Sequence, residues 1–177
     1  MNNLQQKVIL VDEHDKPIGE STVLEAHEGD GKRHRAVSVF LFNKKGELLI
    51  QQRSEKKIVG ALQWANTCCG NVMPNETAIA CAKRRLEQEL GITHVSLTEL
   101  YVFEYHIRCN EEFSEWEIDH VFVGTFDGKP KINADEIVQT RWITFMDLKE
   151  EIKSQPRIFS PWVKIILNEG KVEKYAN

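Results

Sequence analysis

The sequence has no long hydrophobic run: nowhere do about 18 apolar residues stand together, as a membrane-spanning helix requires. Residues 1–19 alternate apolar and charged side chains and lack the apolar stretch of a secretory signal. The chain is therefore expected to be a soluble, untargeted protein of the cytoplasm.

Cysteine is scarce and basic residues are not in excess. Four cysteines in 177 residues are too few for a disulfide framework, and the neighbours Cys68 and Cys69 are poorly placed to bridge each other. All four are expected to be reduced. The net charge is −4 and the Lys and Arg residues are scattered, so nucleic acid is not expected as a partner.

Internal repeats and low-complexity segments are also missing. A chain of 177 residues that is 41% hydrophobic suits one compact domain with a buried core, here residues 1–177. Nothing in the sequence indicates the oligomeric state.

Strands and helices are expected in mixed order, which favours an α+β sandwich. Residues 43–46 form the turn of a hairpin. One helix begins at an N-cap at Asn75 and ends at Gly91; a short helix follows near residues 147–152, and a last one holds residues 163–167. The predicted strands cover residues 8–11, 36–42, 48–52, 63–69, 100–107, 116–126 and 140–143.

The helix before Gly91 has an apolar face, because hydrophobic residues recur at spacings of three and four. We expect this face, made of Ile79, Ala82, Leu86 and Leu90, to pack on the sheet. The residues that flank it are Arg84, Arg85, Gln88 and Glu89.

Carboxylates alternate with apolar residues in the strand at 116–126 and just before it. Side chains alternate across a pleat, so Glu115, Glu117 and Asp119 share one face, while Trp116 and Ile118 share the other. These carboxylates either form a site or protect an exposed strand edge from aggregation.

The spacing of Gly70, Glu76 and Arg84, with five and then seven residues between them, resembles the loop-helix-loop frame of the Nudix superfamily. Nudix hydrolases carry further carboxylates where this chain has Arg85 and Gln88. Hydrolysis of a diphosphate needs several carboxylates to hold divalent ions, so the hydrolytic cluster is depleted here.

Within that superfamily, residues 8–167 resemble the type 1 isopentenyl-diphosphate isomerases. The markers are Trp64-Ala65-Asn66-Thr67-Cys68-Cys69-Gly70, Arg84-Arg85, Glu89-Leu90-Gly91, Glu115-Trp116-Glu117 and Phe159-Ser160-Pro161-Trp162. The resemblance implies a Nudix-type α/β/α sandwich with a mixed sheet, and isomerisation of isopentenyl diphosphate to dimethylallyl diphosphate.

The resemblance also assigns catalytic roles. Cys69 and Glu117 are the proton-transferring pair on opposite sides of the five-carbon substrate, which suits a reaction that adds a proton to one carbon and removes one from another. Tyr105 assists Glu117, and the indole of Trp162 faces the transient carbocation.

The binding residues follow from the same resemblance. A divalent ion (Mn²⁺, Zn²⁺ or Mg²⁺) is bound by His27, His34, Glu115 and Glu117, with Asn71 at the position of the family's third His ligand. Mg²⁺ accompanies the diphosphate on Glu89. The residues that suit the diphosphate are Arg53, Lys57, Arg84 and Arg85, whereas Val23 replaces a diphosphate-binding Lys of the family.

Two other functions stay open on the sequence. One is a pyrophosphohydrolase acting on a nucleotide or prenyl diphosphate, against which Arg85 and Gln88 argue. The other is a catalytically idle diphosphate-binding module, which the departures at Asn71 and Val23 allow.

Overall fold

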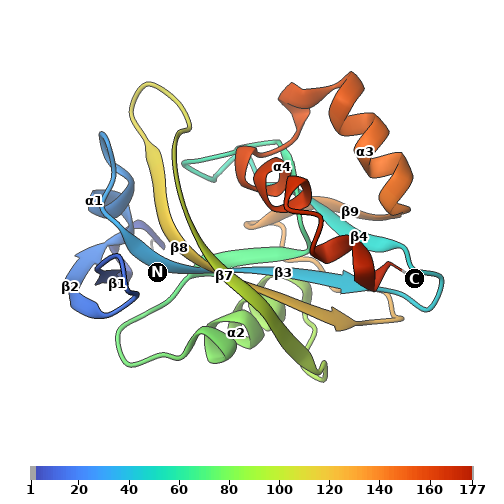
Figure 1. Cartoon of the computed structure of the whole chain (residues 1–177), viewed down its shortest axis with the longest axis horizontal. Coiled ribbons are helices and arrows are strands. Elements are labelled where there is room, and N and C mark those ends of the chain that lie inside the picture. The colour runs from blue at the N-terminus through green and yellow to red at the C-terminus, as the bar shows by residue number, and fades with distance from the viewer. Residues whose placement is uncertain (1–2, 177) are drawn as a thin grey trace.

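The computed structural model describes residues 3–176, in which helices cover both faces of one mixed sheet (Figure 1). The helices are α1 (Val23–His27), α2 (Ala78–Leu90), α3 (Phe145–Ser154) and α4 (Pro161–Asn168), with short 3-10 turns η1 (Asn3–Gln5), η2 (Pro156–Ile158) and η3 (Val172–Tyr175). The strands are β1 (Lys7–Val11), β2 (Pro17–Thr22), β3 (His34–Phe42), β4 (Leu48–Arg53), β5 (Trp64–Ala65), β6 (Cys68–Asn71), β7 (Leu97–Arg108), β8 (Ser114–Thr125) and β9 (Ile137–Ile143).

Strand β3 organises the sheet. It pairs in parallel with β8 along its whole length and antiparallel with β6, and it meets β1 and β4 near its two ends. The β7–β8 hairpin extends the sheet on one side, and β4 carries β5 and β9 on the other. The mixed sheet confirms the α+β prediction.

Two hydrophobic cores lie on opposite faces of this sheet. Leu86 and Leu90 of α2 are fully buried in one core, and α3 and α4 contribute to the other. Successive residues of β8 point to different cores, since Val121 lies with α4 and Phe122 with α2. Each fully buried side chain of this size contributes about 1.5–3 kcal/mol to stability. The pleat therefore decides which side chains meet on each face.

The start of α2 differs from the prediction. Thr77, not Asn75, is the N-cap: its side chain accepts a hydrogen bond from the Ala80 amide at 3.3 Å. Asn75 has a φ of 63°, a left-handed conformation suited to the turn before the helix rather than to a cap. The predicted end at Gly91 is confirmed, with a φ of 65°.

One predicted strand is divided in the structure, and two elements, β2 and α1, were not predicted. The segment at 63–69 splits into β5 and β6, and the expected strand at 8–11 is confirmed but pairs with β2, which was not predicted. Most of β2 is exposed and it contains a proline and a glycine, so it lacks a strand's hydrophobic pattern. Helix α1 has five residues, too few for a helical periodicity to show.

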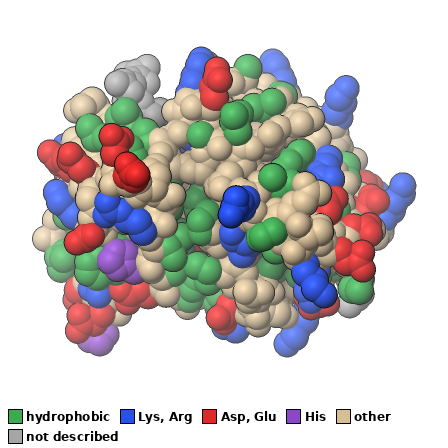
Figure 2. Space-filling view, turned by 90° about the horizontal axis from the view of Figure 1, so that it is seen from above, with side chains coloured by type: hydrophobic (Ala, Val, Ile, Leu, Met, Phe, Trp, Pro, Cys, Tyr) green, Lys and Arg blue, Asp and Glu red, His purple; other side chains and the backbone are tan. Residues whose placement is uncertain are grey.

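Basic and acidic side chains are interspersed over the face of the molecule shown in Figure 2. This mixture matches the scattered Lys and Arg residues of the sequence. Within residues 3–176, every helix is too short or too polar to cross a membrane.

Candidate active site

Cys69 and Glu117 come from the two strands that flank β3. Cys69 of β6 lies opposite Ser38, and Glu117 of β8 lies opposite His34. His34 and Ser38 are four residues apart on β3, so their side chains share one face with those of their partners. Cys68 points to the other face and is buried in the core with α2. The sheet therefore brings the predicted catalytic pair to one surface.

A cavity of about 550 Å³ opens over this surface. Its size is that of an ordinary small-molecule site. Its lining combines predicted catalytic, cationic and metal-binding residues with residues that the sequence did not mark. Among the lining residues are Cys69, Glu117, Tyr105, Trp162, Arg53, Lys57, Arg85, His27, Glu115, Asn71, Val23, Ser38, Asn133 and Glu136.

The Cys69 thiol is held beside a cation in this cavity. Arg53 Nη1 lies 3.3 Å from the sulfur, and the Arg53 guanidinium stacks over the Trp162 ring at 4.9 Å. Burial raises the pKa of Cys69 to about 11, although Arg53 acts in the opposite direction. At neutral pH the sulfur therefore carries a proton.

Glu117 is anchored by two neighbours. The Tyr105 hydroxyl donates to Glu117 Oε2 at 2.5 Å, and His34 Nε2 lies 3.4 Å from Oε1. Burial and the adjacent charge of Glu115 raise the pKa of Glu117. The carboxyl group is thus fixed in orientation.

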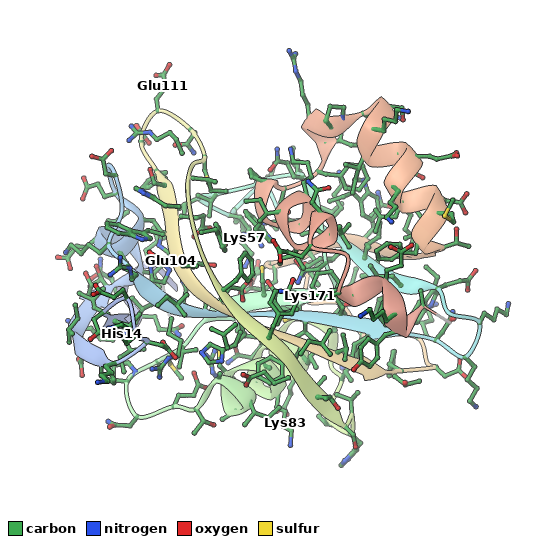
Figure 3. The ribbon with its side chains drawn as sticks, viewed as in Figure 1. His14, Lys57, Lys83, Glu104, Glu111 and Lys171 are labelled. Carbon is green, nitrogen blue, oxygen red and sulfur yellow. The ribbon has the colours of Figure 1, made fainter. Side chains whose placement is uncertain are left out.

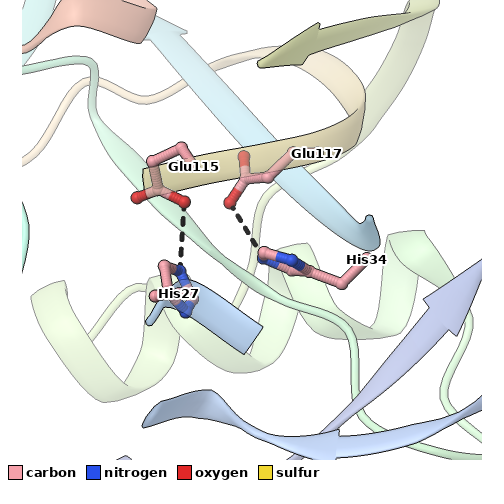
Figure 4. Close-up of side chains that lie close together, drawn as sticks. All are labelled: His27, His34, Glu115 and Glu117. Carbon is pink, nitrogen blue, oxygen red and sulfur yellow. Dashed lines mark ion pairs between the residues drawn. The ribbon is translucent and has the colours of Figure 1, made fainter. Parts of the chain in front are cut away.

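The two histidines present their Nε2 atoms to the two glutamates (Figure 4). His27 Nδ1 lies 2.7 Å from the Val23 carbonyl oxygen, and His34 Nδ1 lies 2.8 Å from that of Lys32. An Nδ1–H donated to a carbonyl leaves the Nε2 lone pair directed at the carboxylates, the arrangement typical of metal-binding histidines.

This cluster fits a divalent cation. One ligand atom from each of His27, His34, Glu115 and Glu117 lies within 4.8 Å of the others, and all four residues are buried. Among the described residues, the partner of Glu115 Oε2 is His27 Nε2 at 3.0 Å, and that of His34 Nε2 is Glu117 Oε1 at 3.4 Å. Burial lowers the pKa of His27, but Glu115 outweighs it and raises that pKa to about 9. Acceptor atoms that converge in this way need a proton or a cation between them.

Asn71 lies on the same face as this cluster. It pairs with Ala36, two residues from His34 on β3, and it lines the cavity. Its amide can offer an oxygen, which is a harder and weaker ligand than an imidazole. Whether Asn71 binds the ion stays a prediction.

Of the four predicted diphosphate-binding cations, three line the cavity and one does not. Arg53, Lys57 and Arg85 line the cavity, and in Figure 3 Lys57 lies on the opposite side of the sheet from Lys83 of α2. Arg84 lies outside it and forms a two-pronged ion pair with Glu76, at 2.6 and 2.8 Å.

The predicted magnesium ligand, Glu89, is also outside the cavity lining. It is 1% exposed, is ion-paired with Arg85 and accepts a hydrogen bond from Gln51 Nε2 at 2.9 Å. Glu89 therefore lies behind Arg85, as seen from the cavity.

Sequence reasoning missed several residues that build the site. Asn66 accepts from Trp162 Nε1 at 3.2 Å and donates to the Cys68 carbonyl at 2.7 Å, so it ties α4 to the strand that carries Cys69. Glu136 contacts both Lys57 and Arg85. The pattern shows only an acidic segment before a strand, and the partners of Glu136 are 51 and 79 residues away.

We expect Gly70→Ala to weaken anion binding. A Cβ at Gly70 would lie 2.7 Å from Arg85 Cγ and 2.9 Å from its Cδ, so the Arg85 side chain must move from its place over β6. The loss of one charge-assisted contact predicts about tenfold or more weaker binding of inorganic pyrophosphate, with about 1–3 kcal/mol lost from the free energy of unfolding. Isothermal calorimetry and denaturant unfolding measure both.

The matched control is Gly19→Ala, because a Cβ there meets no atom within 4 Å. It should bind pyrophosphate as the parent does. Equal affinity in the Gly70→Ala variant would contradict the placement of Arg85 in the anion site.

Comparisons with known proteins show the family of the chain. Residues 32–163 match the family model described as the NUDIX domain. The chain is 38% identical over 165 residues to isopentenyl-diphosphate Delta-isomerase 2 of Photorhabdus laumondii, covering 93% of this chain and 92% of that protein. It is 40% identical over 161 residues to isopentenyl-diphosphate Delta-isomerase of Nocardia farcinica, covering 90% and 91%.

A solved structure with the same fold is that of DR0079 from Deinococcus radiodurans. The TM-score is 0.76 at 22% sequence identity, and the alignment covers 92% of this chain and 98% of that one. At this identity the likeness concerns the fold alone.

Proposed function

The chain belongs to the isopentenyl-diphosphate Delta-isomerase family of NUDIX-domain proteins, and on this premise we propose that it interconverts isopentenyl diphosphate and dimethylallyl diphosphate. The observation that carries the proposal is that Cys69 and Glu117, from strands on either side of β3, line the same cavity. The protein is an isomerase that moves a carbon–carbon double bond.

The reaction needs two proton transfers and no net change in protons. One group adds a proton to the terminal alkene carbon, a tertiary carbocation forms at the branched carbon, and the other group removes a proton from the carbon nearer the diphosphate. Cys69 and Glu117 are this pair, and their roles exchange in the reverse direction. In either direction one group of the pair begins with a proton and the other without one, and burial, which raises the pKa of Cys69 to about 11, keeps the thiol as the protonated member.

Trp162 stabilises the carbocation, and Tyr105 positions Glu117. The indole ring is 3% exposed, and an aromatic face stabilises a desolvated cation by about 2 kcal/mol. Tyr105 holds Glu117 through its hydroxyl. Because both are buried, water is kept from a cation that it would otherwise trap as an alcohol.

The diphosphate binds to Arg53, Lys57 and Arg85 at the cationic side of the cavity. Charge-assisted contacts of this kind favour a phosphate oxygen over water. Mg²⁺ travels with the diphosphate and is the ion that the family resemblance assigns to Glu89. Glu89 is the carboxylate that would hold this ion, and in the structure it is ion-paired with Arg85. Arg84 lies outside the cavity lining, where it pairs with Glu76 and donates to the Asn71 carbonyl at 3.2 Å.

A second divalent ion, Mn²⁺, Zn²⁺ or Mg²⁺, would be held by His27, His34, Glu115 and Glu117, with Asn71 as a further oxygen donor. When bound, such an ion supplies positive charge that polarises the carboxyl group of Glu117. The histidines and Glu115 keep that group oriented toward the cavity.

Divalent cations should stabilise the protein through this cluster. At 100 times its dissociation constant a ligand adds about 2.7 kcal/mol, so Tm should rise by roughly 5–10 °C with saturating Mn²⁺ and fall back with a chelator. His27→Ala should abolish most of this rise, because it removes one of four ligands.

Differential scanning calorimetry with and without Mn²⁺ makes this measurement. His14→Ala is the control, since its side chain is 70% exposed. A Tm rise of the same size in His27→Ala and the parent would place the ion elsewhere.

The proposed function is tested with purified protein, Mg²⁺ and isopentenyl diphosphate. Dimethylallyl diphosphate should form without release of phosphate or pyrophosphate. Release of either without isomerisation would identify a hydrolase.

A further inference from the structure

A row of alternating charges begins at Glu89, behind the cavity lining, and continues along the cationic side of the cavity. Arg85 Nη2 is ion-paired with Glu89 and lies 3.0 Å from Glu136 Oε2, and the same oxygen is ion-paired with Lys57 Nζ. The charges of this row, Glu89, Arg85, Glu136 and Lys57, sum to zero. Two of the three cations proposed to bind the diphosphate are thus already neutralised by the protein.

Glu136 is built into this position. Its carbonyl accepts from the Ser54 amide at 2.9 Å, and its own amide donates to the Asn133 carbonyl at 3.0 Å. The Asn133 amide in turn donates to the Glu89 carbonyl at 2.9 Å, which ties the segment to the end of α2. Glu136 is 6% exposed, and the adjacent cations lower the pKa of its buried carboxyl to about 2. The negative charge is therefore present at every physiological pH.

The third cation, Arg53, differs from the other two. Its guanidinium contacts the Val59 carbonyl, the Cys69 sulfur and the Trp162 ring, and within residues 3–176 it has no carboxylate in ion-pair distance. A multiply charged diphosphate entering the cavity thus meets one uncompensated cation together with the anionic oxygen of Glu136. Like charges at such close range are strongly unfavourable in a buried site.

We propose that Glu136 is a specificity-determining residue that makes the cavity select a divalent-cation complex of a diphosphate over the free diphosphate anion. The carboxylate occupies the space between Lys57 and Arg85, so a phosphate can share these cations only when a bound divalent ion offsets the extra negative charge. This inference rests on the proposed function only in that the site takes a diphosphate.

Calorimetric titration with inorganic pyrophosphate, with and without Mg²⁺, tests the role of Glu136. The parent protein should bind pyrophosphate about 10- to 100-fold more tightly with Mg²⁺ than without it. Glu136→Gln removes the charge and keeps the shape, so it should bind free pyrophosphate more tightly than the parent and lose most of the Mg²⁺ dependence. Glu136→Asp keeps the charge and should keep that dependence.

Asp127→Asn is the matched control, because Asp127 is a carboxylate outside the cavity lining, is 46% exposed and pairs with Lys44. It should behave as the parent. Two results would overturn the proposal: a parent protein that binds free and Mg²⁺-bound pyrophosphate equally, or a Glu136→Gln variant that weakens both alike. The first is decided on the parent, so the test does not depend on the variant's folding.

The isomerase function is tested separately from the role of Glu136. If the parent binds pyrophosphate with this Mg²⁺ dependence but does not convert isopentenyl diphosphate, the isomerase assignment is wrong and the role of Glu136 remains.

Discussion

Cys69→Ala should lower kcat for the isomerisation by about 10²–10⁴-fold or more, the range that a positioned acid–base group contributes. The variant keeps the cavity, the cations and the metal cluster, so pyrophosphate binding and the Mn²⁺-induced rise in Tm should stay close to the parent. Steady-state kinetics with isopentenyl diphosphate, together with both binding measurements, give the comparison.

Cys68→Ala is the matched control for this variant. Cys68 is the adjacent thiol on the same strand, but it is fully buried in the core with α2 and does not line the cavity. Its replacement removes one buried sulfur and should cost stability rather than chemistry. If Cys69→Ala retained the parent's kcat, the proposed proton transfer would have no support.

Glu117→Gln should have a comparable effect on kcat and an additional effect on metal binding. The amide can still accept a hydrogen bond from Tyr105, but it can neither give up nor take a proton, so turnover should again fall by about 10²–10⁴-fold. Because Glu117 is also one of the four clustered ligands, the Mn²⁺-induced rise in Tm should shrink. Kinetics and calorimetry measure the two losses independently.

Glu111→Gln serves as the control carboxylate. Glu111 lies at the tip of the β7–β8 hairpin and points away from the molecule (Figure 3). It should match the parent in both measurements. A Glu117→Gln variant that lost metal binding but kept its kcat would assign Glu117 to the ion alone and leave Cys69 without a partner.

Much of the fold could be predicted because the local pattern and the tertiary structure agree. The hydrophobic face of α2 and the alternation of Glu115, Glu117 and Asp119 are both periodic signals, and each face packs as its period predicts. The N-cap could not be placed, since Asn75 and Thr77 are both good cap residues and only the turn geometry separates them. That residues 1–177 form one domain stays a prediction.

The site was predicted from motifs, so the prediction covers only the residues that the motifs contain. Cys69 and Glu117 belong to marker segments, and the shared cavity that contains them is formed by strand pairing on β3. The position of Glu89 behind Arg85 is decided by side-chain packing, which a motif does not encode. Glu136 carries no motif, and its role depends on cations from two distant segments.

The most direct test of the central claim is proton NMR of isopentenyl diphosphate incubated with the purified protein and Mg²⁺ in D₂O. A proton-transferring pair in one cavity predicts formation of dimethylallyl diphosphate with deuterium in the methyl group that derives from the terminal alkene carbon. The Cys69→Ala and Glu117→Gln variants should give neither product nor label. Recovery of unlabelled isopentenyl diphosphate after prolonged incubation with the parent protein would contradict it.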